Sequence, residues 1–472
     1  MSIYDSAIYK FLTGPLNDIA WLYILLPCVF IGGVFLTIGS GAVQFRRFGF
    51  AMKNTVGKMF KKTKAEKGAV TPLQAVTTAL AATVGTGNIV GTSQAIAMGG
   101  YGAVFWLWIA ALLGMVIKYS EVTLSIRYRQ RDEDGDWVGG PMYYIENGMG
   151  PRWKWLAVAF SMLAALASFG IGNMSQSNSI VGSLNGAVTA MNPDFAGQTV
   201  LNWVIGLTLA ALTALVLFGG IKRIGAVTEK LIPFMSVLYI LVSLIVIVGD
   251  WKGIVPAFGK IFGAAFTPRA VLGGASGITL RQAVVWGLRR SAFSNEAGLG
   301  SAPIAHAAAQ CKSPVDQGIY GIFEVFMDTI VICTLTALTI IISGVGIEFG
   351  VKPGSELISS AFGTVLSDKV AAVFVAVALA LFAYSTILGW SLYGSRCIQH
   401  LFGLKAAKVY QIIFVIMIVV GSVSSLDFVW NIADTLNGLM AIPNFIALFA
   451  LSPVVFKLTR EYFARYDAQK NK

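Results

Sequence analysis

Long apolar stretches recur along almost the whole chain, and they restrict its fold more than any other feature. Each is about 20 residues long, which is the length a helix needs to cross the hydrocarbon core of a membrane. Only 12% of the 472 residues are charged, against about 25% in an ordinary soluble domain. A water-soluble globule is therefore excluded, and we expect an all-α polytopic membrane protein.

Eleven membrane-spanning helices are predicted from these stretches. They cover residues 19–45, 72–98, 102–126, 153–184, 199–219, 226–249, 280–309, 316–344, 369–399, 406–423 and 427–456. Two other apolar segments, 254–272 and 355–366, are too short or too interrupted to cross. We expect them to be re-entrant or interfacial pieces on the outside.

Basic residues are distributed unevenly between the loops. With eleven spans, 25 Lys and Arg residues fall on the side of the C-terminus and seven fall on the opposite side. Basic loops stay in the cytoplasm, so we expect the N-terminus outside and the C-terminus inside a cell or inner membrane. The net charge of +12 thus follows membrane topology and needs no nucleic-acid partner. The basic run at 46–67 is expected to lie near anionic membrane lipid.

Two of the predicted helices contain glycine and polar residues at membrane depth. The second span contains Gly85, Thr86, Gly87, Asn88 and Gly91, and the seventh contains Ser294, Asn295, Glu296, Gly298, Gly300 and Pro303. Backbone in a membrane must be hydrogen-bonded, so an interrupted helix is tolerated only where it is buried or lines a wet cavity. We therefore expect a binding site at the two interruptions. The alternative is that the glycines only allow close helix packing.

The two interrupted helices divide the chain into comparable halves. Counting five helices from each predicts a first repeat at 72–249 and a second at 280–456. Residues 1–71 then hold an outer tail, one extra helix and the basic loop, 250–279 form the outer segment, and 457–472 form a cytoplasmic tail. Paired interrupted helices at corresponding positions are typical of secondary transporters.

Five sequence blocks combine glycine, polar and aromatic residues in an unusual way. They are TALAATVGTGNIVG at 78–91, GGYGAVFWLWIAALLG at 99–114, GGPMYYIENGMG at 139–150, FGIGNMSQSN at 169–178 and FSNEAGLGSAPIAHAAA at 293–309. These blocks resemble the sodium:alanine (alanine or glycine:cation) symporter family. The resemblance implies the leucine-transporter fold of the amino acid-polyamine-organocation superfamily, with two inverted five-helix repeats. It also implies symport of Na⁺ with a small neutral amino acid, usually alanine or glycine and in a few members glutamine.

Hydrogen-bond donors for a substrate carboxylate are expected at the first interruption. A half-helix start supplies free amides without a buried cation, which favours Thr86, Gly87 and Asn88. The resemblance puts the carboxylate on the amides of Thr86 and Gly87, while Asn88 either stabilises the break or bonds only to a neighbouring carbonyl. Asn173 and Gln176 share one helical face. The resemblance makes Gln176 a substrate contact, and for Asn173 an interhelical hydrogen bond is an equal alternative.

The second interruption is expected to bind the substrate amino group. Once helical hydrogen bonds are lost, the stretch through Phe293, Ser294 and Asn295 offers free oxygens. Phe293 and Trp390 are candidates for closing the pocket over a small side chain, although aromatic residues in spans more often pack in the core.

A sodium site follows from the resemblance. Na⁺ takes oxygen ligands, which carbonyls and hydroxyls supply without extra charge. The shared site of the fold maps onto the carbonyls of Ala81 and Val84 and the hydroxyls of Ser385 and Thr386. The alternative is that the two hydroxyls bond back to carbonyls one turn earlier. Na⁺ is the coupling ion that the sequence predicts.

Charged residues within spans are costly and indicate function by default. Arg289, Arg290 and Glu296 surround the second interruption, and we expect a gate network that changes partners between states. Lys118 and Glu121 share a helical face, and we expect a structural ion pair between them.

The sequence therefore predicts a Na⁺-coupled symporter that works by alternating access. A proton-coupled transporter and an amino acid exchanger of the same fold remain alternatives. A channel is disfavoured by the two asymmetric interrupted helices. An intramembrane enzyme is disfavoured because GxSxG, HExxH and paired Asp motifs are absent from the sequence. Neither the exact amino acid nor the oligomeric state is predicted.

Overall fold

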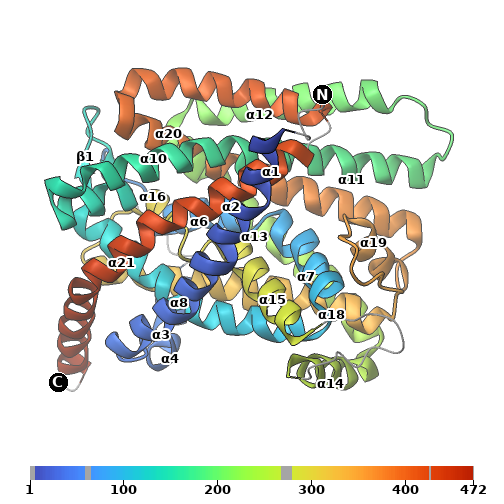
Figure 1. The fold of residues 1–472 in the computed structure, drawn as a ribbon, viewed down its shortest axis with the longest axis horizontal. Coiled ribbons are helices and arrows are strands. Elements are labelled where there is room, and N and C mark those ends of the chain that lie inside the picture. Colours follow the sequence, from blue (N-terminus) through green and yellow to red (C-terminus); the bar gives the residue numbers. More distant parts are fainter. Residues whose placement is uncertain (1–5, 59–64, 267–278, 425–426, 471–472) are drawn as a thin grey trace.

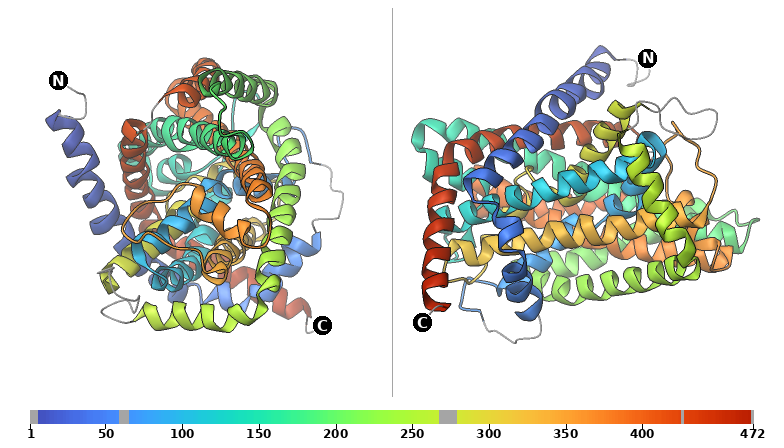
Figure 2. Two further views of the ribbon diagram at one scale, coloured as in Figure 1. Left: turned by 90° about the vertical axis from the view of Figure 1, so that its right-hand side faces the viewer. Right: turned by 90° about the horizontal axis from the view of Figure 1, so that it is seen from below.

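The computed structural model describes residues 6–58, 65–266, 279–424 and 427–470. Most of these residues are helical, and many of the long helices run side by side along the longest axis of the molecule (Figure 1). Seen along that axis they form a bundle, with the first helices at its periphery (Figure 2).

The N-terminal region forms one nearly continuous helix and then turns. Its pieces are α1 (Ala7–Thr13), α2 (Pro15–Asp18), the π-helical turn η2 (Ile19–Leu25), α3 (Leu26–Gly39), α4 (Val43–Arg46), α5 (Phe48–Thr55) and the 3₁₀ turn η3 (Val56–Lys58).

The next part of the chain holds five spans. Its elements are α6 (Pro72–Thr83), η4 (Gly87–Gly91), α7 (Thr92–Gly99), α8 (Gly102–Tyr128), η6 (Pro151–Trp153), α10 (Lys154–Phe169), η7 (Gly170–Met174), α11 (Ser175–Met191), α12 (Gln198–Leu217) and α13 (Gly220–Gly249). Between α8 and η6 lie β1 (Gln130–Arg131), β2 (Trp137–Val138), α9 (Pro141–Tyr144) and η5 (Ile145–Met149). β1 and β2 pair antiparallel, with Gln130 opposite Val138.

The remaining elements form the second half. They are η8 (Trp251–Gly253), α14 (Ile254–Ala265), α15 (Leu280–Asn295), α16 (Ala302–His306), α17 (Pro314–Val325), η9 (Phe326–Cys333), α18 (Thr334–Ser343), α19 (Glu356–Gly363), α20 (Asp368–Val423) and α21 (Asp427–Lys470). The short helices α14 and α19 fall within the two segments that were predicted not to cross.

The predicted number of spans is confirmed. Eight helices of the described residues are long and apolar enough to cross a membrane. One of them, α20, contains two spans, because Gly403 has a left-handed backbone (φ 80°) and bends it. The two interrupted helices, α6 with α7 and α15 with α16, bring the total to eleven.

Exposed apolar side chains mark the surface that faces lipid. They are frequent on α12 and α13, and include Val200, Trp203, Leu207, Leu215, Phe234, Leu241 and Val248. Such a surface would be unfavourable in water over this area, and it is what a membrane-embedded helix presents to hydrocarbon.

Both interrupted helices begin with the same local structure. Each starts at a threonine of the pattern T-x-x-Q-A-V, at Thr71 and at Thr279. In each, the threonine hydroxyl accepts a hydrogen bond from the backbone N–H of the glutamine. The glutamine side-chain oxygen in turn accepts one from the backbone N–H of the threonine, which completes a capping box. The two halves of the chain therefore start their first helix in the same way.

The two interrupted helices run in opposite directions. The start of the first lies against the end of the second, because Val70 N donates to Ala308 O at 2.9 Å. The end of the first lies against the start of the second, where a Cβ on Gly99 would be 3.2 Å from Gln282 O. Their interruptions consequently meet near the middle.

Candidate functional site

The first interruption begins where the helical hydrogen bonds of α6 stop. The amide of Val84 still makes a helical hydrogen bond of 2.8 Å, but its backbone is extended (ψ 90°). The next amide, that of Gly85, donates to Asn88 Oδ1 at 2.8 Å. The Ala81 carbonyl thus loses the partner it would have in a continuous helix. A Cβ on Gly85 would lie 2.3 Å from Thr386 Oγ1, so this position requires glycine.

The second interruption is held open by side chains from other helices. Glu296 has a left-handed backbone (φ 56°), which costs about 1–2 kcal/mol for a residue with a Cβ. Gly298 and Gly300, also left-handed, both donate their amides to Glu121 Oε1 at 3.1 Å. Asn444 donates to the Gly298 carbonyl at 2.8 Å. These contacts replace the helical hydrogen bonds that the interruption removes.

Asp328 connects the two interruptions. They are in contact, since a Cβ on Gly87 would lie 3.3 Å from the Cα of Ser294. The buried Asp328 carboxylate accepts from Asn88 Nδ2 at 2.6 Å, from Ser294 Oγ at 3.0 Å and from Thr329 Oγ1 at 2.7 Å. It lies on the π-helical turn η9. The predicted site did not include Asp328, although a carboxylate in an apolar span is itself a signal of function.

A cavity of about 270 Å³ lies at the interruptions. Thr86, Gly87 and Phe293 line it, so three of the predicted substrate residues are brought together. Thr86 and Gly87 begin the second part of the interrupted helix, where amides have no acceptor within the helix. The cavity wall therefore offers hydrogen-bond donors that carry no net charge.

Three other predicted substrate residues are placed beside this wall and already have partners. Asn88 and Ser294 bond to Asp328, as described above. Asn295 Nδ2 donates to Thr329 Oγ1 at 3.1 Å, and its Oδ1 accepts from Ala297 N at 3.0 Å. Their side chains stabilise the two interruptions, and the cavity-lining residues do not include them.

Asn173 and Gln176 are buried on the fourth span. Asn173 Nδ2 donates to Phe414 O at 2.7 Å, which is the interhelical bond given as the alternative. Gln176 Nε2 donates to Ile171 O at 2.9 Å, within its own span. The Oδ1 of Asn173 and the Oε1 of Gln176 have no hydrogen-bond partner among the described residues. Each amide can still accept one hydrogen bond.

Oxygen atoms gather where the sodium site was predicted. Ser385 Oγ lies 3.4 Å from Val84 O, and Thr386 lies against Gly85. Both hydroxyls also bond back to Phe382 O, at 2.8 and 3.1 Å, as the alternative had it. A hydroxyl donates one proton and keeps lone pairs, so these bonds leave both oxygens able to bind a cation.

Charged side chains line the cavity on one side. Arg289, Arg290, Lys352 and Asp434 belong to its wall. Arg289 makes an ion pair with Asp434 and also donates to Asn17 Oδ1 at 2.9 Å. Burial, together with the nearby Arg290 and Arg289 guanidinium groups, lowers the pKa of Lys352. This side of the cavity is therefore rich in positive charge.

The structure does not bring Glu296 together with Arg289 and Arg290, and their role as a gate stays a prediction. Glu296 accepts from Ser301 and from Trp390 Nε1, the latter at 2.8 Å, whereas Arg289 pairs with Asp434. The carboxylate follows the left-handed turn at the end of α15 toward α20, and the arginines, one to two turns earlier, face the cavity. Trp390 is buried against Glu296 and is not among the residues that line the cavity.

The predicted ion pair between Lys118 and Glu121 is wrong. Lys118 Nζ lies 3.4 Å from Glu324 Oε1, and His306 Nε2 lies 3.1 Å from the other oxygen of that carboxylate. Glu121 lies almost one turn farther along α8, and its carboxylate accepts hydrogen bonds from the backbone amides of the second interruption. Spacing placed both residues on one face correctly, but the neighbouring chain segments decide their partners.

Comparison with known proteins identifies the family. Residues 6–472 match the model of the sodium:alanine symporter family. The chain belongs to this family. A sodium/alanine symporter, AgcS, from Methanococcus maripaludis is 42% identical over 455 residues, which cover 96% of each chain. A probable sodium/glutamine symporter, GlnT, from Bacillus subtilis is 36% identical, covering 98% of this chain and 93% of its own.

The fold of this sodium:alanine symporter family member is also found among solved structures. The crystal structure of MhsT in complex with L-phenylalanine superposes with a TM-score of 0.57 at 15% identity, covering 84% of this chain and 99% of MhsT. Together with the eleven spans, this establishes the leucine-transporter fold. Family and fold are those of secondary transporters and not of enzymes, and the family supports cation-coupled amino acid symport.

Proposed function

We propose that this chain is a Na⁺-coupled symporter that imports alanine or glycine by alternating access. The cavity of about 270 Å³ between the two interruptions carries the proposal. Pockets for drug-sized ligands measure about 300–1,000 Å³, so a cavity just below that range suits a small substrate. The printed name of AgcS supports alanine, and that of GlnT makes glutamine the competing substrate.

The substrate would bind across the meeting point of the two interruptions. Its carboxylate accepts from the amides of Thr86 and Gly87, whose helix start favours negative charge. Its amino group donates to backbone oxygens at Phe293 through Asn295, and the Phe293 ring packs on the small side chain. Gln176 contributes a further contact through its unpartnered Oε1.

The coupling ion would bind behind the first interruption. Ala81 and Val84 supply carbonyl oxygens there, and Ser385 and Thr386 supply hydroxyls from α20. Because these ligands come from two different helices, a bound cation draws the interrupted helix and α20 together. Closer packing of these two helices would link binding of the ion to binding of the substrate one turn away.

Transport across the bundle requires a fixed orientation. We infer that the N-terminus lies outside and the C-terminus inside, from the distribution of basic residues. The cavity reaches Lys352, in the loop between α18 and α19, which would then face outward. A C-terminal tag should react with a membrane-impermeant reagent only after the cells are permeabilised.

Uptake of labelled alanine into proteoliposomes tests the coupling ion. An inward Na⁺ gradient should drive accumulation, whereas an inward K⁺ gradient should not. Accumulation driven by a proton gradient alone would replace the sodium assignment with proton coupling. Exchange of internal for external alanine that is indifferent to both gradients would identify an exchanger.

A pair of variants on α20 tests the sodium site. Thr386→Val keeps the shape but removes the hydroxyl, and it should raise the Na⁺ concentration for half-maximal uptake at least tenfold. Ser391→Ala is the matched control, because Ser391 is also buried and, among the described residues, its hydroxyl bonds only to Leu388 O at 2.7 Å. Equal effects of the two variants would contradict the proposed site.

Competition by unlabelled amino acids tests the substrate. Alanine and glycine should inhibit uptake at similar concentrations, since one methyl group in an apolar pocket changes binding by only about 1–3 kcal/mol. Stronger inhibition by glutamine would move the assignment to a larger amide substrate, without affecting the sodium site.

A further inference from the structure

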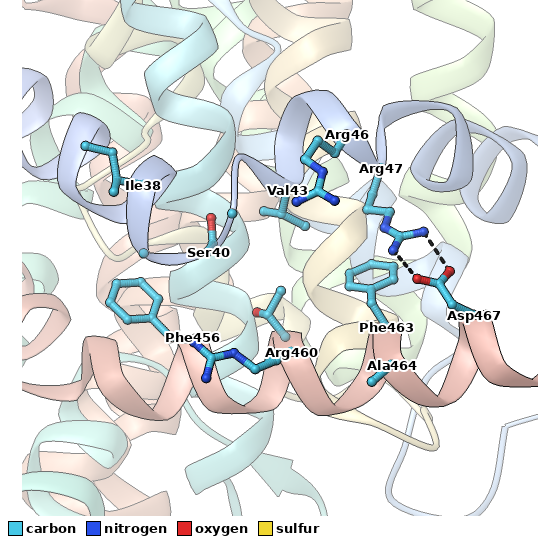
Figure 3. Close-up of a pocket in the computed structure, with 13 residues that line it drawn as sticks. Ile38, Ser40, Val43, Arg46, Arg47, Phe456, Arg460, Phe463, Ala464 and Asp467 are labelled. Atoms are coloured by element: carbon cyan, nitrogen blue, oxygen red, sulfur yellow. Dashed lines mark hydrogen bonds and ion pairs between the residues drawn. The ribbon is translucent and has the colours of Figure 1, made fainter.

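A second and larger cavity, of about 410 Å³, shares no lining residue with the first (Figure 3). It is formed between the turn that follows α3 and the last part of α21. Ile38, Ser40 and Arg46 line it from the first segment, and Phe456, Arg460 and Phe463 line it from the second. Figure 3 shows Arg46 and Arg460 entering from opposite segments.

Two of the three arginines at this cavity, Arg46 and Arg460, make no direct ion pair with a carboxylate of the described residues, although the charge of Arg46 also acts on Asp467. Arg47 makes a two-pronged pair with Asp467, at 2.9 and 2.5 Å, and its guanidinium lies 4.6 Å from the Phe463 ring. Arg46 and Arg460 make no ion pair with any other described residue. The cavity therefore presents two guanidinium groups with free donors, which suit a phosphate.

The backbone of the turn places Arg46 at the cavity. Gly41 and Ala42 both have left-handed backbones (φ 69° and 56°). The turn is fastened to the end of α3 by Ala42 N, which donates to Thr37 O at 2.7 Å, and by Gln44 Nε2, which donates to Thr37 Oγ1 at 2.8 Å. A left-handed alanine persists only where its surroundings hold it, so Arg46 is presented by a fixed turn.

The cavity lies at the end of a membrane-spanning helix, which is where we expect lipid headgroups to begin. α3 is the end of a membrane-spanning helix, and α21 turns there to run across the ends of the other helices (Figure 1). Pro453 lies inside α21, and proline is the usual cause of such a bend. Next to the two arginines, Ile38 is 76% exposed and Phe35 is 43% exposed, which provides an apolar surface on the membrane side.

We propose that this cavity binds the headgroup of an anionic phospholipid. Arg46 and Arg460 bind its phosphodiester, the Ser40 hydroxyl lies beside them, and the acyl chains run along Ile38 and Phe35. Free phosphate would use the arginines but not the exposed apolar surface, which favours the lipid. A bound lipid ties the start of the chain's first loop to its last helix.

Lipid titration of the detergent-purified full chain, followed by native mass spectrometry, tests the proposal. Short-chain phosphatidylglycerol should bind, and phosphatidylcholine of the same chain length should bind at least tenfold more weakly. The double variant Arg46→Gln/Arg460→Gln should weaken phosphatidylglycerol binding about tenfold or more, because it removes two charge-assisted contacts. Both side chains are exposed, so the variant should unfold at the same temperature as the parent.

A second double variant separates this site from general surface charge. Lys53→Gln/Arg465→Gln removes the same net charge from exposed positions on α5 and α21 that do not line the cavity, and it should bind the lipid normally. Equal weakening by both double variants would overturn the proposal. Displacement of the lipid by millimolar inorganic phosphate would assign the cavity to a free anion instead.

Discussion

Asp328 joins two helix interruptions that are far apart in sequence. Three hydroxyl or amide donors converge on its carboxylate, and two of them come from the interruptions themselves. A carboxylate can accept all three, because both of its oxygens carry free lone pairs. This one side chain therefore fixes the relative position of the backbone segments that we propose to bind substrate.

Asp328→Asn should disrupt this connection. The new amide group would face donors and could accept on only one of its two terminal atoms, so at least one buried donor would lose its partner, at a cost of about 1–3 kcal/mol. Alanine uptake should fall at least tenfold, and the thermal midpoint in detergent should also fall. Asp316→Asn, near the start of the same span, should change uptake much less. Normal uptake by Asp328→Asn would show that the interruptions hold their positions without it.

Gly85→Ala should abolish uptake, because its Cβ would lie 2.3 Å from the Thr386 hydroxyl oxygen. Either the interrupted helix or α20 must move, and the oxygens of the proposed sodium site separate. Gly182→Ala is the control, since its Cβ would meet no described atom within 4 Å apart from the chain neighbours and backbone of its own helix, and alanine favours a helix by about 1 kcal/mol. A sodium dependence that is unchanged in Gly85→Ala would argue against a cation at this place.

Charged side chains are buried in the contact between α8 and α17. Lys118 and Glu324 are fully buried, and Glu324 is also bonded to His306. Gln317 Nε2 in turn lies 2.8 Å from His306 Nδ1. Lys118 Nζ makes no hydrogen bond within the described residues, and the carboxylate that forms an ion pair with it there is that of Glu324, 3.4 Å away. Such a pair adds little net stability as a whole, but leaving one of its members without the other is costly.

Lys118→Met should therefore destabilise the protein strongly. Removing one member of a buried pair costs about 3–5 kcal/mol, because the other charge is left uncompensated. Adding Glu324→Gln should restore most of the lost stability, which thermal unfolding of the single and double variants would measure. Additive losses in the double variant would mean that the two side chains are not coupled.

At the scale of the whole molecule, the extra N-terminal helix contacts two residues of the cavity wall, Arg289 and Asp434. Asn17 bonds to Arg289, to Asp434 at 3.0 Å and to Thr435 at 3.1 Å. The Arg289 guanidinium also lies 4.9 Å from the Trp21 ring. The helix that precedes the two halves thus contacts the first helix of the second half and the last helix of the chain.

Asn17→Ala should change transport although Asn17 lies outside both halves. Loss of its bonds frees Arg289 and Asp434 to separate, so the Michaelis constant for alanine should change severalfold while the protein remains folded. Tyr23→Ala is the control, because Tyr23 is 69% exposed on the same helix. Identical kinetics of the parent and Asn17→Ala would limit this helix to a role as an anchor.

Hydropathy was sufficient to predict the spans, because crossing a membrane imposes a length and a composition on each helix. The two interruptions were also predictable, because clustered glycine and asparagine at membrane depth weaken a helix that lipid would otherwise keep continuous. The bounds were less accurate where polar residues continue a helix. α21 extends to Lys470, well past the predicted end of the last span, because its final turns leave the membrane direction and need no apolar run.

Side-chain partners could not be predicted in the same way. Helical spacing showed that Lys118 and Glu121 share a face, but their partners come from chain segments that sequence spacing does not relate to α8. The pairing of Asp434 with Arg289 could not be predicted for the same reason, because only the packed fold brings the two side chains together. The roles proposed for the substrate and sodium residues stay predictions until transport is measured.

The connection through Asp328 also has a consequence for the order of assembly. Asn88 is separated from Asp328 by 240 positions, so when the first half leaves the ribosome its interruption still lacks this partner. Unpaired polar backbone groups are costly in lipid. Until Asp328 has been synthesised, those of the first interruption must therefore be hydrogen-bonded by water, by the insertion machinery or by another segment. The transport centre can therefore close only after most of the chain has been synthesised, and variants that slow the second half should leave the first exposed to membrane proteases.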